Sequence, residues 1–153
     1  MSNEGLGLYS LLITHCSLLI LKGVRMSLVP KELLYTDQHE WLQLKGDIAT
    51  VGITDYAQHE LGDIVFVELP GVGDRVSQGQ PFGTVEAVKT VAELFAPVSG
   101  QVVEVNESLT ENAAQVNQDP YAVGWMIRVR VENPDEVSRL LTPEEYERLI
   151  KGL

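Results

Sequence analysis

The stretch that decides the fold is TVEAVKTVAE, Thr84–Glu93. Its two ends belong to two apolar, strand-like runs, Phe82–Ala87 and Val91–Ala96, and Lys89 lies between them. Runs of this kind separated by a few residues predict two strands joined by a tight turn. Between Arg75 and Arg128 no other residue is positively charged. The sequence therefore predicts a single lysine at an exposed hairpin tip.

Composition limits the classes of function in which this lysine can take part. The chain has 153 residues, 44% hydrophobic and 22% charged, which predicts one globular domain. Its net charge is −11, with 11 basic and 22 acidic residues. That balance argues against binding to nucleic acid or to anionic membranes, and favours protein partners with basic faces. Cys16 is the only cysteine, and no Cys/His cluster has metal-ligand spacing, so we expect neither an intrachain disulfide nor a metal site.

The first 25 residues differ from the rest. Gly5–Leu21 carries no charge but is shorter than the roughly 20 residues of a membrane span. It lacks the basic start of a signal peptide and the arginines of a mitochondrial presequence. Because Met26–Pro30 looks like a fresh start, we interpret residues 1–25 as an apolar extension of doubtful origin and residues 26–153 as the domain. A membrane-touching tail is the alternative.

The rest of the chain is predicted to be short strands with a few helical pieces. A β-hairpin is expected around Lys45-Gly46-Asp47, and a short helix is expected over Asp55–Gly62 with Asp55 as its cap. Further strands are predicted at Ile64–Val67 (buried), Gln101–Val105 and Trp125–Val131, and helices after the caps Asn133 and Thr142. Gly62–Glu68 resembles Gly100–Asn106. Two similar β-rich halves predict a small sandwich or flattened barrel.

Three interpretations of Lys89 can be weighed on the residues alone. A solubilising turn residue is the commonest role of a lysine. A Schiff-base lysine must be neutral, but Glu86 and Glu93 are the nearest charges in sequence and favour the ammonium form. The third interpretation is that another enzyme modifies Lys89, which requires an exposed, fixed tip with recognisable neighbours such as Glu86 and Val88.

Several segments then resemble one family in the right order. They are DIATVGITDYAQHELGDIVFVELP, the segment Glu86-Ala87-Val88-Lys89, APVSGQVVEVN and VNQDPYAVGWM. From Leu34 to about Leu149 the chain resembles the glycine cleavage H-protein family of lipoyl carriers. The resemblance implies a mostly β, lipoyl/biotinyl-type flattened barrel-sandwich hybrid with short peripheral helices and a C-terminal helix.

The resemblance also implies a function. Lys89 would carry lipoate as N6-lipoyllysine, attached by a lipoate ligase or a lipoyl/octanoyl transferase that recognises Glu86 and Val88. The arm would take aminomethyl from a PLP-dependent glycine decarboxylase (P protein) to a tetrahydrofolate-dependent aminomethyltransferase (T protein). Dihydrolipoyl dehydrogenase (L protein) would then reoxidise it. The protein would be a carrier without catalytic residues, cytoplasmic, of bacterial type and with no stable membrane association.

The resemblance implies that the loaded arm is sheltered in a surface cleft. Alignment with its motif makes Glu40 and Glu93 the acidic candidates, and the alternative is that both are solvated surface carboxylates. The family's cleft histidine aligns with Glu60, one position from His59, so neither is assigned to the site. Two departures from the family pattern are Ala87, where serine is usual, and Gln38, where serine or threonine is common.

Other functions remain open at this point. A biotin carrier usually has methionines beside its lysine, and Val88 and Thr90 stand here. A lipoyl domain of a 2-oxo acid dehydrogenase usually has Asp-Lys-Ala within a longer chain. A lipoate relay protein, donating lipoyl groups to 2-oxo acid dehydrogenases, would need the same exposed lysine. A purely structural β-sandwich would leave the matching motifs unexplained.

Overall fold

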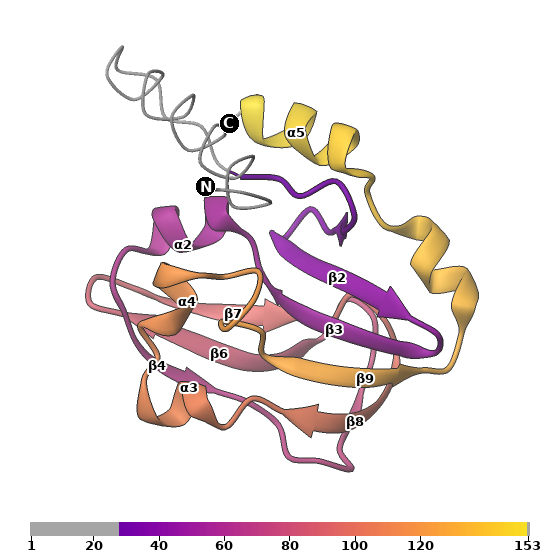
Figure 1. Cartoon of the computed structure of the whole chain (residues 1–153), viewed down its shortest axis with the longest axis horizontal. Coiled ribbons are helices and arrows are strands. Elements are labelled where there is room, and N and C mark those ends of the chain that lie inside the picture. Colours follow the sequence, from indigo (N-terminus) through magenta and orange to yellow (C-terminus); the bar gives the residue numbers. More distant parts are fainter. Residues whose placement is uncertain (1–27, 153) are drawn as a thin grey trace, which may run out of the picture.

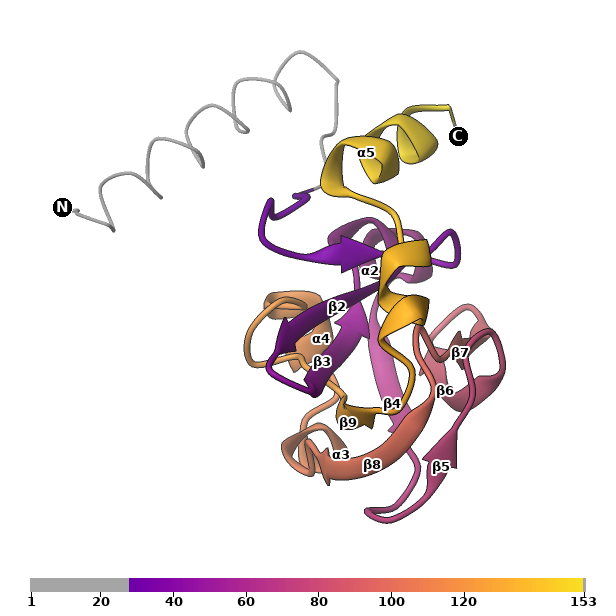
Figure 2. The ribbon, with the colours of Figure 1, turned by 90° about the vertical axis from the view of Figure 1, so that its right-hand side faces the viewer.

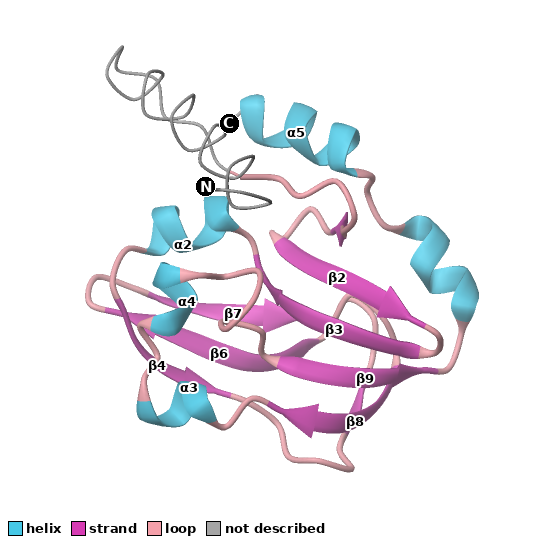
Figure 3. Cartoon of the chain, in the orientation of Figure 1, coloured by secondary structure: helices cyan, strands magenta, loops and turns pink. Residues whose placement is uncertain are grey.

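Two antiparallel sheets make up the computed structural model, which describes residues 28–152 (Figures 1 and 3). The larger sheet has the order β1 (Leu34–Tyr35), β2 (Glu40–Lys45), β3 (Ile48–Ile53), β9 (Ile127–Val131), β8 (Gly100–Val105), β5 (Arg75–Val76). The smaller has the order β4 (Ile64–Glu68), β6 (Pro81–Ala87), β7 (Val91–Phe95). The sheets are not closed into one barrel, and the predicted mostly β, flattened sandwich is confirmed.

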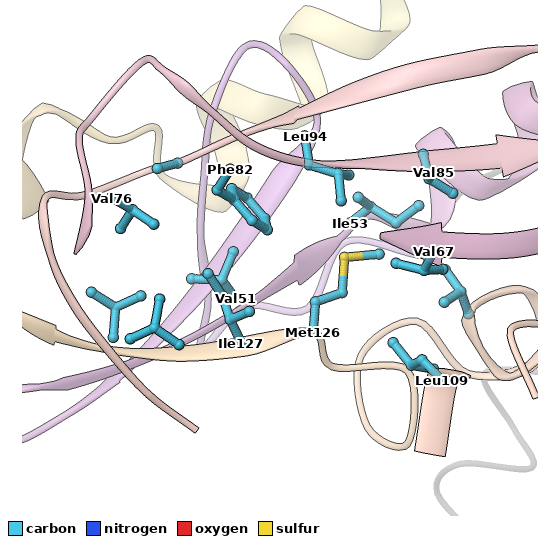
Figure 4. Close-up of a cluster of buried hydrophobic side chains, with 14 of the residues drawn as sticks. Val51, Ile53, Val67, Val76, Phe82, Val85, Leu94, Leu109, Met126 and Ile127 are labelled. Atoms are coloured by element: carbon cyan, nitrogen blue, oxygen red, sulfur yellow. The ribbon is translucent and has the colours of Figure 1, made fainter. Parts of the chain in front are cut away.

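The main core lies between the sheets, because both contribute buried apolar side chains to one cluster. Val51 and Ile127 come from the larger sheet, and Val67, Val85 and Leu94 come from the smaller (Figure 4). A second buried cluster joins Leu33, Tyr35 and Trp41 to Tyr146 near the C-terminus. The Tyr35 and Tyr146 rings stack there with centroids 4.6 Å apart.

Short helices close the ends of the sandwich. They are α2 (Asp55–Leu61), α3 (Ser108–Glu111), α4 (Gln115–Gln118), the 3-10 helix η1 (Pro134–Arg139) and α5 (Pro143–Lys151). The caps predicted at Asn133 and Thr142 are present, the latter as a full capping box. In the turned view of Figure 2, α5 lies at one end of the molecule and β5 at the other.

The predicted cap of α2 is wrong. Thr54 is the N-cap, since its Oγ1 accepts a hydrogen bond from the Ala57 amide at 3.2 Å. The Asp55 carboxylate is used elsewhere and accepts from the Leu28 amide at 3.0 Å and from Gln58 Nε2 at 2.8 Å. An adjacent Thr-Asp pair offers two capping side chains, and tertiary contacts decide between them.

Two strand predictions also need correction. Ile64–Val67 is not a buried run, because Val65 and Phe66 are 57% and 44% exposed. The register shifts between Ile64 and Phe66, which breaks the alternation of faces in this edge strand. Trp125 precedes β9, and the Arg128 guanidinium stacks 4.0 Å from its ring centroid instead of pointing to the opposite face.

The predictions for residues 1–25 fall outside the part of the chain that is described. Within residues 28–152, no helix has both the length and the apolar character needed to span a membrane.

Candidate functional site

Lys89 lies at the exposed end of the β6–β7 hairpin, in a turn that we call the tip (Val88–Thr90). The Ala87 amide donates to the Thr90 carbonyl at 2.8 Å and closes the turn. The Val88 amide donates to the Asp63 carbonyl at 3.0 Å, which ties the tip to the segment between α2 and β4. Val88 is 76% exposed, so the residue before the lysine projects into solvent. The tip is thus exposed and fixed in position.

Glu86 lies on the outer face of the smaller sheet beside the tip. In the strand register it stands between Phe66 of β4 and Val91 of β7. Phe66 and Val91 are 44% and 62% exposed. An exposed carboxylate between two exposed apolar side chains therefore adjoins the lysine.

A cleft of about 420 Å³ opens between β2, α2, β6 and β7. Its apolar wall comes from both sheets and from α2, and consists of Ile53, Tyr56, Ala57, Leu61, Val85, Ala92, Leu94 and Phe95. Figure 4 shows Ile53, Val85 and Leu94 directed toward one another. The polar lining consists of Gln38, His39, Glu40, Glu60 and Glu93. Glu40 and Glu93, assigned to the site from the sequence, thus line the same cleft.

Glu40 is buried, with an exposed fraction of 1%, so the interpretation of it as a solvated surface carboxylate is wrong. One oxygen accepts from the Thr36 hydroxyl at 2.5 Å and the other from the Phe95 amide at 3.1 Å. Burial raises the pKa of Glu40 to about 7, although both hydrogen bonds favour its charged form. A cation that enters the cleft would favour the ionised form of this carboxyl group.

Glu93 and Glu60 differ from Glu40 in being exposed at the cleft. Glu93 lies on β7, opposite Thr84 of β6, and Glu60 lies on α2. Glu60, which was not assigned to the site from the sequence, also lines the cleft. His59 does not line it, and its Nδ1 lies 3.5 Å from Asp55 Oδ2.

Helical periodicity could have separated these two neighbours. Tyr56, Ala57, Glu60 and Leu61 recur at the spacing of one helix face and all line the cleft. His59 falls outside that face and pairs with Asp55 one turn earlier. Once the helix is predicted, its period is enough to predict which residues share the face that carries Tyr56 and Ala57.

His39 closes one side of the cleft. Its backbone is left-handed, with φ 72°, and its Nδ1 lies 2.9 Å from the Tyr146 hydroxyl. Burial lowers the pKa of His39, which keeps the ring neutral near pH 7. The Tyr56 ring lies 4.8 Å away, centroid to centroid. His39 therefore acts as a neutral wall, and the charged groups of the cleft are its carboxylates.

This arrangement suits the binding of a long apolar chain with a cationic end. The apolar wall can cover methylene groups, and three carboxyl groups line the same space. Within residues 28–152, Lys89 forms no ion pair, and no group of His, Cys, Asp or Glu could hold a metal ion.

Comparison with known proteins gives a consistent answer. The family described as glycine cleavage H-protein matches residues 33–152. A glycine cleavage system H protein of Carboxydothermus hydrogenoformans is 56% identical over 126 residues, covering 82% of this chain and 97% of that protein. One of Rubrobacter xylanophilus is 58% identical over 127 residues, covering 82% and 98%. The crystal structure of a glycine cleavage system H protein from Mycobacterium marinum superposes with a TM-score of 0.74 at 44% identity, covering 82% of this chain and all of that one.

Proposed function

Since the chain belongs to the glycine cleavage H-protein family, we propose that Lys89 carries lipoate in amide linkage and that the protein shuttles aminomethyl groups derived from glycine. The observation that carries the proposal is the exposed Lys89, fixed at a hairpin tip beside an apolar and acidic cleft. The relatives are named for glycine cleavage, which does not favour the lipoate relay alternative.

The residues present fit the lipoyl group. Pockets of roughly 300–1,000 Å³ with mostly apolar walls suit small organic groups, and the cleft lies within that range. The lysine stem lies against Gly62, the residue that follows Leu61 of the cleft wall. When attached, lipoate supplies a disulfide that accepts the aminomethyl group and two electrons.

The protein's own residues protect the cargo. In an aminomethyl group bound to sulfur, a free nitrogen lone pair can form an iminium and expel the thiolate as the C–S bond breaks. A protonated amine has no free lone pair, so the loaded group is stable. Glu40, Glu60 and Glu93 line the cleft in which the ammonium would lie. Carboxylates favour the protonated amine, and the apolar wall limits access of water.

Attachment requires another enzyme to recognise the tip. We assign this recognition to Glu86 and Val88, and extend it to the exposed Phe66 and Val91 that flank Glu86 across the sheet. The enzyme would be a lipoate ligase or a lipoyl/octanoyl transferase. A docking face with apolar and basic groups would match this surface.

The same tip would serve three partners in turn. These are the glycine decarboxylase, the aminomethyltransferase and the dihydrolipoyl dehydrogenase, and each would supply the catalytic groups for its step. The protein itself would act as a carrier, because tethering keeps the arm at high effective concentration at each active site. Its bacterial relatives support placing it in the cytoplasm.

Reconstitution with the three partner enzymes tests this function. Lys89→Arg retains the charge of the tip but offers no amine that forms the amide. We expect the variant to fold and to support no glycine cleavage, whereas Lys45→Arg, at the end of β2, keeps full activity. Activity of Lys89→Arg equal to that of the wild type would refute the proposal.

A further inference from the structure

The direction in which the arm leaves Lys89 depends on a segment outside the hairpin. The tip is closed by the backbone hydrogen bond from Ala87 to Thr90, and the Val88 amide donates a hydrogen bond to the Asp63 carbonyl. Asp63 lies between the end of α2 and the start of β4. The position of the tip relative to the cleft therefore depends on where residues 62–64 are held.

Asn117 of α4 holds that segment on both sides of Asp63. Its Oδ1 accepts from the Ile64 amide at 2.9 Å, and its Nδ2 donates to the Gly62 carbonyl at 2.8 Å. The same Nδ2 donates to Gln58 Oε1 at 2.9 Å. An amide N–H can only donate and a carbonyl can only accept, so the two backbone groups fix the orientation of the Asn117 side chain. We call these four residues the Asn117 clamp (Gln58, Gly62, Ile64, Asn117).

The lysine stem crosses the clamp. A Cβ atom built on Gly62 would lie 3.4 Å from Lys89 Cε and 3.9 Å from Nζ. Gly62 has φ 82°, a conformation that glycine adopts without strain, and it caps the carboxyl end of α2. Leu61, the preceding residue, lines the cleft. Lys89 thus runs over the end of α2, at the margin of the cleft. Figure 1 shows α2, α4 and the β6–β7 turn at the same end of the molecule.

We propose that Asn117 is a positioning residue for the lipoyl arm: its clamp fixes the tip so that the arm leaves across Gly62 toward the cleft. The inference rests on the proposed function. Return of a flexible arm to its own cleft is a loop closure, whose entropic cost falls when the root of the arm is held in a favourable direction. Loss of the clamp would leave the arm and the cleft groups unchanged but would make docking less frequent.

The test uses the full-length chain with Asn117→Asp. This near-isosteric change keeps an acceptor for the Ile64 amide and removes both donated hydrogen bonds. The matched control is Gln118→Ala, an exposed neighbour in α4 whose side chain makes no hydrogen bond within residues 28–152.

The first readout needs no lipoate. Amide hydrogen exchange, followed by NMR, reports directly on the Val88–Asp63 bond. Loss of one or two hydrogen bonds corresponds to about a tenfold change in the local opening equilibrium. We therefore expect the Val88 amide to exchange about tenfold faster in Asn117→Asp than in the control. Amides of the β2–β3 hairpin should be unchanged. Parallel acceleration at Val88 and in β2–β3 would show that Asn117 only stabilises the fold, and would overturn the inference.

The second readout separates docking from general handling of the arm. The lipoylated proteins are loaded by the decarboxylase without the folate enzyme, and formaldehyde release is followed. We expect release from Asn117→Asp to be about three- to tenfold faster, in line with lost hydrogen bonds, while kcat/KM of the dihydrolipoyl dehydrogenase stays unchanged. Release equal to that of Gln118→Ala would overturn the inference and leave the carrier function intact. A wild-type protein that takes no lipoate at Lys89 would instead refute the proposed function.

Discussion

At the scale of single residues, Glu40 is the group whose environment departs most from the sequence expectation. It follows the left-handed His39 at the start of β2, and its side chain turns inward to the Phe95 amide of β7. This contact could not be predicted from either strand, because it joins residues 55 positions apart that belong to different sheets. Buried carboxyl groups respond to pH in a way that surface carboxylates do not.

Stability should therefore fall as pH rises through the titration range of Glu40. Its folded pKa of about 7 exceeds the ordinary value of 4.5, so the native state binds more protons between these values. The free energy of unfolding should drop by up to about 3 kcal/mol across that window. Urea unfolding at pH 5 and pH 8 measures it. Glu40→Gln should lose this part of the pH dependence, while the opposing effect of His39 remains in both proteins. Identical pH profiles would contradict the burial argument.

Glu93 should matter for the cargo and not for stability. It is exposed, and an exposed ion pair contributes only about 0.2–1 kcal/mol, so Glu93→Gln should melt near the wild-type temperature. Its loaded form should release formaldehyde faster, because one carboxylate of the cleft is lost. Glu68→Gln is the control, since Glu68 lies in the same cross-strand row but does not line the cleft. Equal release from both variants would exclude Glu93 from the site.

At the scale of elements, α5 contacts two residues that shape the cleft through the hydroxyl of Tyr146. The Tyr146 hydroxyl lies 2.7 Å from Thr54 Oγ1 and 2.9 Å from His39 Nδ1. Thr54 caps α2, and His39 lines the cleft, so one buried hydroxyl connects the C-terminal helix to two walls. The Thr142 capping box fixes where this helix begins.

Removing that hydroxyl should destabilise the domain. Tyr146→Phe keeps the ring stacked on Tyr35 but removes the hydroxyl that pairs with the buried Thr54 hydroxyl and the half-buried His39 ring, at a cost of about 1–3 kcal/mol. Denaturant unfolding measures the change. Tyr56→Phe is the matched control, since the Tyr56 hydroxyl forms no hydrogen bond among the described residues. A loss of stability as small as that of the control would show that the connection is unimportant.

Local signals explain which elements the sequence could predict. The β6–β7 hairpin and the capping box of α5 are encoded by neighbouring residues, and both were predicted. The exposed Val65 and Phe66 were missed because a register shift in an edge strand leaves no trace in an apolar run. The contacts of Asn117 could not be predicted for a related reason, since its partners lie 53–59 positions away.

At the scale of the whole molecule, residues 28–152 contribute a continuous core. The main cluster spans Leu42 to Val129, and β1, at one edge of the larger sheet, begins at Leu34. We therefore expect deletion of residues 1–25 to leave the melting temperature and lipoylation unchanged. Thermal unfolding and intact mass of the two forms check this. A clear drop in melting temperature would show that the segment packs on the domain.

The central claim is that Lys89 carries lipoate, and peptide mass mapping of the protein from its native cell tests it most directly. The account predicts one lipoyl group per chain, located on the peptide that contains Lys89, and none on any other lysine. Lipoate on a different lysine, biotin on Lys89, or an unmodified Lys89 in cells whose other lipoyl proteins are loaded would contradict it.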